Sequence, residues 1–169
     1  MAAGSPALHV LTDFSWELPS VIEVHKSIDE ALQRMIAAGV RALLVVRDDH
    51  VLGLVTSYDI QGERPLQILR ASNYTRHDEI EVGDVMTPWS ALSTLNWPAA
   101  EVARVHYLED ALGATRASHI LLIEHDEYQR VTVRGLLSRK RLERQLGRVA
   151  PEDSISSTGD TSAHGVLLG

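Results

Sequence analysis

The side chains best placed to do chemistry are a hydroxyl and a carboxylate three positions apart, Thr56 and Asp59. They follow residues 51–55, an apolar and β-branched run that is typical of a buried strand. A helix that begins at Ser57 would place both groups at its N-terminus, where backbone N–H groups and the helix dipole favour anions. A hydroxyl suits a phosphate and a carboxylate suits two vicinal hydroxyls, so the pair fits the ribose-phosphate of a nucleotide.

The same spacing also predicts a capping box, in which Thr56 and Asp59 satisfy backbone donors and bind no ligand. A four-residue motif does not decide between a cap and a binding site. The two roles can also share one geometry at different times. The elements around the motif are therefore needed to weigh the two interpretations.

Length and composition indicate an ordinary soluble protein of one domain, or of one domain built from two halves. The chain has 169 residues, of which 44% are hydrophobic and 23% charged. There is no apolar run long enough for a membrane span and no secretory signal at the start, and the absence of cysteine excludes disulfides and thiolate chemistry. We therefore expect a cytoplasmic location, and the net charge of -7 argues against general nucleic-acid binding.

The first half of the chain shows the order strand, helix, strand, strand, helix. Residues 21–24 predict a short strand, and Ser27 opens a helix that Gly39 ends. Residues 42–46 form a continuous apolar run, which fits a strand buried on both faces. The strand at 51–55 and the helix after it complete the set.

The same order recurs in the second half. The predicted elements are a strand at 91–95, a turn or short helix at 97–100, a helix at 105–115, strands at 119–123 and 131–138, and a final helix at 139–146. Gly135 and Ser138 take the places of Gly53 and Thr56. This internal repeat is stronger evidence for the fold than the prediction of any single element. One unit cannot bury its apolar face alone, whereas two units packed face to face can bury both faces.

These elements resemble a tandem pair of CBS domains, also called a Bateman module. The residues that carry the resemblance are 27–32, 39–46 and 53–60 in the first repeat, the connector 82–88, and residues 118–123 and 135–138 in the second. The resemblance covers residues 21–147 and implies a stand-alone module. It also implies an α+β fold of two β-α-β-β-α repeats, packed as a pseudo-twofold pair around a central cleft.

We accordingly expect four segments along the chain. Residues 1–11 would be a loose N-terminal arm, 12–80 the first CBS repeat with the connector, 81–148 the second CBS repeat, and 149–169 a disordered tail.

The resemblance implies a ligand that contains adenosine, such as AMP, ADP, ATP, S-adenosylmethionine or NAD. In the family the Asp of the Thr-x-x-Asp pattern holds the ribose hydroxyls, the Thr or Ser holds phosphate, and backbone at the start of the second strand faces adenine. Carried over to this sequence, the expected ligand-binding residues are Thr56, Ser57, Asp59, Arg41, Ala42 and Leu43, with Val24 lining the base pocket.

The second repeat departs from this pattern, because Arg141 stands where the first repeat has Asp59. A guanidinium cannot accept a hydrogen bond from a ribose hydroxyl, so a second adenosine site is not expected. Ser138, Arg139 and Arg141 could instead hold phosphates, or they could form only a solvated basic helix face.

No catalytic motif stands out, so we expect a protein that is not an enzyme and needs no cofactor. The segments 77–79 and 125–127, each His-Asp-Glu, lie in polar stretches and are expected to face water instead of a metal. The first hypothesis is a regulatory homodimer that senses an adenosine ligand and signals through an unknown effector protein. The alternative is a CBS-fold dimerisation or protein-interaction module that has lost its ligand. A nucleic-acid binder ranks third.

Overall fold

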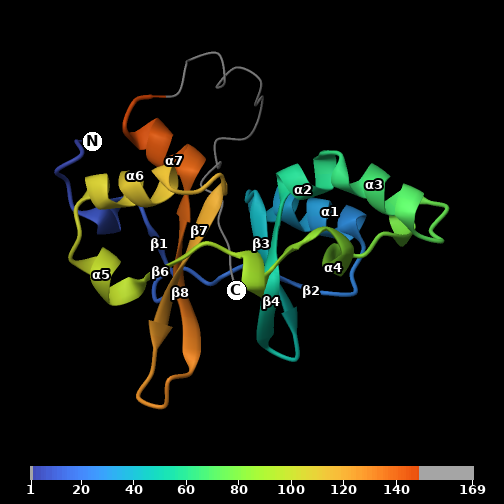
Figure 1. Cartoon of the computed structure of the whole chain (residues 1–169), viewed down its shortest axis with the longest axis horizontal. Coiled ribbons are helices and arrows are strands. Elements are labelled where there is room, and N and C mark those ends of the chain that lie inside the picture. Colours follow the sequence, from blue (N-terminus) through green and yellow to red (C-terminus); the bar gives the residue numbers. More distant parts are fainter. Residues whose placement is uncertain (1, 149–169) are drawn as a thin grey trace. The chain divides into compact units, whose positions relative to one another are not determined.

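The computed structural model describes residues 2–148, which fall into two compact units (Figure 1). Residues 18–92 form the repeat-one unit, and residues 2–17 together with 93–148 form the repeat-two unit. Each unit contains one four-stranded sheet with helices, in the predicted β-α-β-β-α order. The predicted α+β class is therefore confirmed, while the tail at 149–169 lies outside the described residues.

The repeat-one sheet has the strand order β2-β3-β4-β5, with β2 and β3 parallel and the other pairs antiparallel. Its strands are β2 (Val21–Glu23), β3 (Ala42–Arg47), β4 (His50–Thr56) and β5 (Thr87–Pro88). Its helices are α1 (Ile28–Ala38), α2 (Ser57–Gln61), α3 (Arg64–Ala71) and α4 (Val82–Val85), with 3-10 turns η2 (His77–Glu79) and η3 (Trp89–Ala91).

Helix α1 begins and ends where the sequence predicts. The Ser27 side chain accepts a hydrogen bond from the backbone of Glu30, and Gly39 ends the helix in the left-handed conformation at φ 69°. Ile28, Ala31 and Met35 face the core. Because the residues of β3 from Ala42 to Val46 are also buried, the apolar face of α1 and this central strand supply much of the repeat-one core.

The repeat-two sheet has the strand order β1-β8-β7-β6. Its strands are β1 (Thr12–Asp13), β6 (Thr94–Asn96), β7 (His119–His125) and β8 (Val131–Ser138). Its helices are α5 (Trp97–Glu101), α6 (Val105–Gly113) and α7 (Arg139–Gln145), with the 3-10 turn η1 (Ala7–His9). The strand expected at 91–95 begins later, because residues 89–91 form η3 instead.

The N-terminal segment is packed, which corrects the expectation of a loose arm at 1–11. Ala7, Val10 and Leu11 are buried in the repeat-two core beside residues such as Leu108 and Leu112 of α6. The Ala7 amide also donates to the Ala103 carbonyl at 3.0 Å. The partners lie about a hundred positions away, so no local pattern in the sequence reveals this contact.

The segment that leads into each repeat pairs with the last strand of the other repeat. Strand β1 runs antiparallel to β8, with Thr12 opposite Leu136. Strand β5 runs antiparallel to β4, with Thr87 opposite Leu54. The unit boundaries at 17/18 and 92/93 therefore differ from the predicted boundaries at 11/12 and 80/81.

This exchange gives a physical reason for the two matching glycines. A Cβ atom at Gly53 would lie 2.3 Å from the Thr87 carbonyl oxygen, and one at Gly135 would lie 2.5 Å from that of Thr12. Both distances are far below van der Waals contact, so only glycine lets the incoming edge strand approach. The match of Gly135 to Gly53 thus reflects the same structural requirement in both sheets.

Candidate functional site

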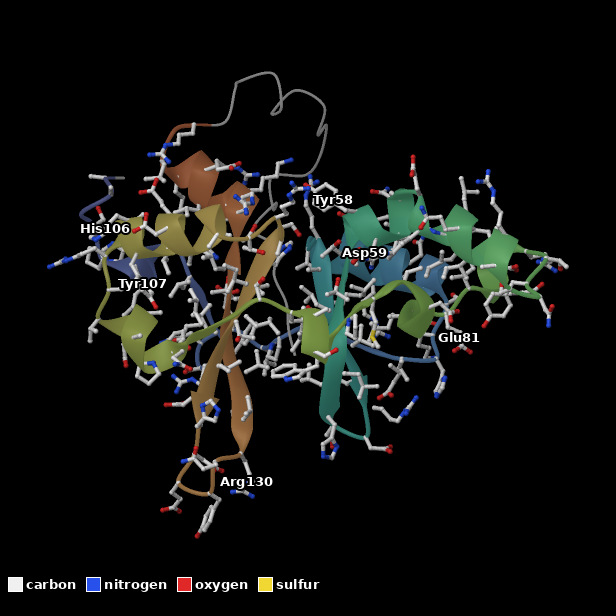
Figure 2. All side chains as sticks on the ribbon, in the orientation of Figure 1. Tyr58, Asp59, Glu81, His106, Tyr107 and Arg130 are labelled. Atoms are coloured by element: carbon white, nitrogen blue, oxygen red, sulfur yellow. The ribbon has the colours of Figure 1, made fainter. Side chains whose placement is uncertain are left out.

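Thr56 and Asp59 form a capping box at the junction of β4 and α2. The Asp59 amide donates to Thr56 Oγ1 at 3.3 Å. In return, the backbone N–H and the hydroxyl of Thr56 donate to Asp59 Oδ2 at 2.9 and 3.1 Å. Figure 2 shows Asp59 at the start of α2, beside Tyr58. The geometry is that of the predicted cap, and it gathers the hydroxyl and the carboxylate at one point.

The second oxygen of Asp59 meets an arginine that the sequence did not single out. Arg64 Nη1 lies 3.1 Å from Asp59 Oδ1, and the same nitrogen donates to the Val85 carbonyl. The Asp59 side chain is only 15% exposed, against 45% for Arg64. Burial raises the pKa of Asp59, and the hydrogen bond from the Thr56 backbone and the charge of Arg64 offset this rise in part. The site therefore holds a partly buried carboxylate, and its counter-ion is a half-exposed arginine.

The start of β3 lies directly beside this group. Ala42 is opposite Thr56 and Leu43 is opposite Val55 in the β3–β4 ladder, and the Ser57 amide donates to the Arg41 carbonyl at 2.9 Å. The structure thus brings together the predicted residues of β3, β4 and α2. The side chains of Ala42 and Leu43 are fully buried.

Arg41 and Val24 differ in their surroundings. Arg41 Nε is buried and has no hydrogen-bond partner within residues 2–148. Val24 follows β2 and donates its amide to the Val46 carbonyl, which places it four residues along β3 from Ala42. That separation is about 13 Å. Val24 packs instead beside Gly83 of α4, so the structure does not bring it to the Thr56–Asp59 group.

The corresponding junction in the repeat-two unit holds Ser138, Arg139 and Arg141. Ser138 caps α7 by accepting from the Arg141 amide at 3.3 Å. The Arg139 guanidinium donates at 2.7 to 3.2 Å to the carbonyl of Leu112 in the last turn of α6 and to those of Thr115 and Ala117 between α6 and β7. Arg139 is therefore part of the internal hydrogen bonding of this unit and not of a solvated basic face.

Arg141 is bound to the N-terminal segment. Its Nη1 donates to Thr12 Oγ1 at 2.8 Å, and its Nε is buried without a partner within residues 2–148. Thr12 itself is 1% exposed. The guanidinium that replaces Asp59 thus serves as a link between α7 and β1 in this structure.

A buried histidine, His119, is the feature of this junction that the sequence interpretation missed. It lies opposite Ser138 in the β7–β8 ladder, as Ala42 lies opposite Thr56 in the repeat-one sheet. Burial lowers the pKa of His119 to about 4, so the ring is neutral at pH 7, and its Nδ1 is 2.8 Å from Ser118 Oγ. In the sequence, the signal that could have revealed a buried histidine is its position at the start of the apolar run 119–123.

Two other classes of site receive no support from the described residues. Within residues 2–148 there is no group of three or more side chains able to hold a metal ion. His77 instead pairs with Asp29 at 3.4 Å, and Asp126 pairs with Arg130 at 2.7 Å; Arg130 is labelled in Figure 2. Of the helices in this part of the chain, none has the length and apolarity that crossing a membrane requires.

The comparisons with known proteins agree with this architecture. The family model of the CBS domain matches residues 17–64. Among curated proteins, none matches this sequence. Three similar solved structures extend the likeness to most of the chain.

The first structure is the CBS-pair protein CBSX2 from Arabidopsis thaliana, with 22% identity and a TM-score of 0.54 over 87% of this chain and 99% of that one. CBSX2 in complex with AMP gives 21% identity and a TM-score of 0.56 over 86% and 98%. An uncharacterized conserved protein from Pyrococcus horikoshii gives 22% and 0.60 over 89% and 98%. Residues 17–64 are therefore similar to a CBS domain, and the chain has the fold of a CBS pair.

Proposed function

We propose that this protein is a regulatory module that binds an adenosine-containing ligand on repeat one and signals through a partner protein. The observation that carries the proposal is the Thr56–Asp59 group, a partly buried carboxylate and a buried hydroxyl at the junction of β4 and α2. This group lies inside the segment matched by the CBS-domain model. The similar protein CBSX2 has been solved with AMP, which supports the ligand class.

The chemistry of the group suits a nucleoside phosphate. The carboxylate of Asp59 accepts hydrogen bonds from the two ribose hydroxyls, and charge-assisted bonds of this kind are the stronger ones. The Thr56 hydroxyl, which now donates to Asp59 Oδ2, turns to donate to a phosphate oxygen. Backbone at the start of β3, from Arg41 to Leu43, faces the base. The ligand is AMP, ADP, ATP, S-adenosylmethionine or NAD.

We place one such site on each chain, because Arg141 in repeat two cannot accept from a ribose. In repeat two, Arg139 bonds carbonyl groups and Arg141 bonds Thr12. Ser138, which is also expected to hold phosphate, has a hydroxyl at the position that Thr56 takes in repeat one. The protein acts by binding, and the effector protein reads the occupied state.

The alternative is a CBS-fold homodimerisation or protein-interaction module that has lost its ligand. One observation favours it: both oxygens of Asp59 already have protein partners. A second is that Ile36, Tyr58 and Leu66, on α1, α2 and α3, are 66%, 54% and 54% exposed. Large apolar side chains exposed on neighbouring helices suit a protein interface.

Calorimetric titration of AMP, ATP and S-adenosylmethionine into the wild-type protein and the Asp59→Asn variant decides between these functions. Asn keeps an acceptor for the Thr56 amide but removes the charge that the ribose needs. We expect at least one ligand to bind the wild type, and Asp59→Asn to weaken it by about 10- to 100-fold. The control is Asp110→Asn, which removes an exposed carboxylate from α6 and leaves binding unchanged.

The alternative gives a different result in the same samples. It predicts no heat with any ligand. A dimer mass by light scattering is expected under both functions and does not separate them. Ligand binding that is indifferent to Asp59→Asn contradicts the assignment of the site. Two equivalent sites per chain contradict the role given to Arg141.

A further inference from the structure

Arg64 occupies a position that joins the candidate site to the connector. It is the first residue of α3, and its Nη1 lies 3.1 Å from Asp59 Oδ1. The same nitrogen donates to the carbonyl of Val85, the last residue of α4. One guanidinium nitrogen therefore bridges a carboxylate at the start of α2 and a carbonyl at the end of α4.

The two oxygens of Asp59 are bound in different ways. Oδ2 accepts from the backbone N–H and the hydroxyl of Thr56, and the backbone bond keeps it in the cap even when the hydroxyl turns to a phosphate. Oδ1 faces Arg64, its one partner among the described residues. Because a ribose with two vicinal hydroxyls needs the free side of the carboxylate, it must take the oxygen that Arg64 occupies.

The Val85 carbonyl depends on the same contact. The last carbonyls of a helix lack intrahelical donors, and a cation beside them also complements the helix dipole. Val85 is fully buried, so its carbonyl has little access to water once Arg64 leaves. Losing Arg64 therefore weakens the end of α4, immediately before β5.

We propose that Arg64 is a competitive lock on Asp59, meaning that it occupies the carboxylate oxygen that a bound ribose needs. A ribose therefore has to displace Arg64, and the displacement of Arg64 loosens α4. This inference rests on the adenosine site proposed above. In the free protein, Arg64 neutralises Asp59 and ties α3 to α4. In the bound protein, the ribose takes Asp59 Oδ1, the half-exposed Arg64 side chain moves into solvent, and the occupied state reaches the connector through Val85.

The affinity test compares AMP with 2′,3′-dideoxy-AMP, which keeps the base and phosphate but lacks both ribose hydroxyls. Removing the lock by Arg64→Ala should tighten AMP binding by about tenfold, the scale expected for a partly exposed ion pair with an added hydrogen bond. The dideoxy ligand should show no gain. Arg64→Met, which keeps the aliphatic stem, should behave like Arg64→Ala, and both should melt as cooperatively as the wild type.

The matched control is Arg70→Ala, which removes the same charge from the same helix. Arg70 is exposed in the last turn of α3, and among the described residues no hydrogen bond or ion pair joins it to Asp59 or to the Val85 carbonyl. Its replacement should leave the affinities for both ligands unchanged. A gain with Arg70→Ala equal to that with Arg64→Ala would assign the effect to net charge and overturn the lock.

Hydrogen exchange supplies the second arm of the test. The Met86 amide donates to the Val82 carbonyl at 3.0 Å within α4. We expect saturating AMP to speed its exchange severalfold in the wild type. In Arg64→Ala the exchange should already be fast without ligand, and AMP should not change it further.

The outcomes separate this inference from the function on which it rests. If neither protein binds AMP, ATP or S-adenosylmethionine, both proposals fail. If both bind with equal affinity, or if AMP binding weakens in Arg64→Ala because Arg64 holds the phosphate, the site stands and the lock is overturned. An equal gain for AMP and for dideoxy-AMP also overturns it, because the ribose hydroxyls would then play no part.

Discussion

The buried imidazole of His119 makes the stability of this protein depend on pH in a way that can be calculated. An unperturbed histidine titrates near pH 6.5, and burial lowers the pKa of His119 to about 4. The unfolded chain therefore binds a proton between pH 6.5 and 4 that the folded chain rejects. The contribution of His119 to the free energy of unfolding is fully present above about pH 6.5, and it is lost as the pH drops toward 4. The difference of roughly 2.5 pKa units corresponds to about 3 kcal/mol.

The perturbation is His119→Leu, which keeps an apolar side chain of similar size and removes the titrating ring. Urea unfolding at pH 7, 6, 5 and 4.5 measures the free energy of unfolding for the wild type and the variant. Carboxyl groups protonate in both proteins, so the difference between the two curves isolates His119. We expect the wild type to lose about 2.5 kcal/mol more than His119→Leu between pH 7 and pH 4.5, because the lowest pH still lies above the folded pKa of about 4.

The control is His106→Leu, because His106 is exposed on α6 (Figure 2). Its pH curve should run parallel to that of the wild type. NMR of the imidazole Cε1 proton gives a direct check, and the His119 resonance should titrate near pH 4. Parallel curves for wild type and His119→Leu, or a His119 midpoint near 6.5, would refute the reasoning.

The remaining predictions concern stability. Gly53→Ala should lower the free energy of unfolding by about 3 kcal/mol, because its Cβ would lie 2.3 Å from a backbone carbonyl oxygen. The control Gly113→Ala, for which no atom is found within 4 Å of the new Cβ, should leave that free energy unchanged or raise it by up to about 1 kcal/mol. Equal effects of the two variants would contradict the edge-strand explanation. Arg139→Met should destabilise by about 2 kcal/mol, since three carbonyls lose a charged donor, whereas Lys140→Met on the same helix should change the free energy of unfolding by less than about 0.5 kcal/mol. Deleting residues 1–11 should lower the melting temperature by several degrees, because the deletion removes apolar side chains from the repeat-two core. An unchanged melting curve would mean that the segment does not contribute to stability.

The sequence determined the features that rest on local interactions. The caps at Ser27 and Thr56 are visible in the sequence, because a cap joins residues only three positions apart. The apolar runs that became β3 and β7, and the glycine that ends α1, are local signals of the same kind. The CBS resemblance followed from the order of these elements and from their repetition.

Only the tertiary structure decided which strand each lead segment joins and which groups surround the site. Strand β1 bonds to β8 more than a hundred residues away, and two-residue strands carry no periodicity from which a partner can be predicted. Arg64 reaches Asp59 around the turn at Gly62, and His119 is brought to Ser138 by the register of a ladder. These contacts join residues whose spacing in sequence follows no local rule, so the packing of the folded chain alone determines them.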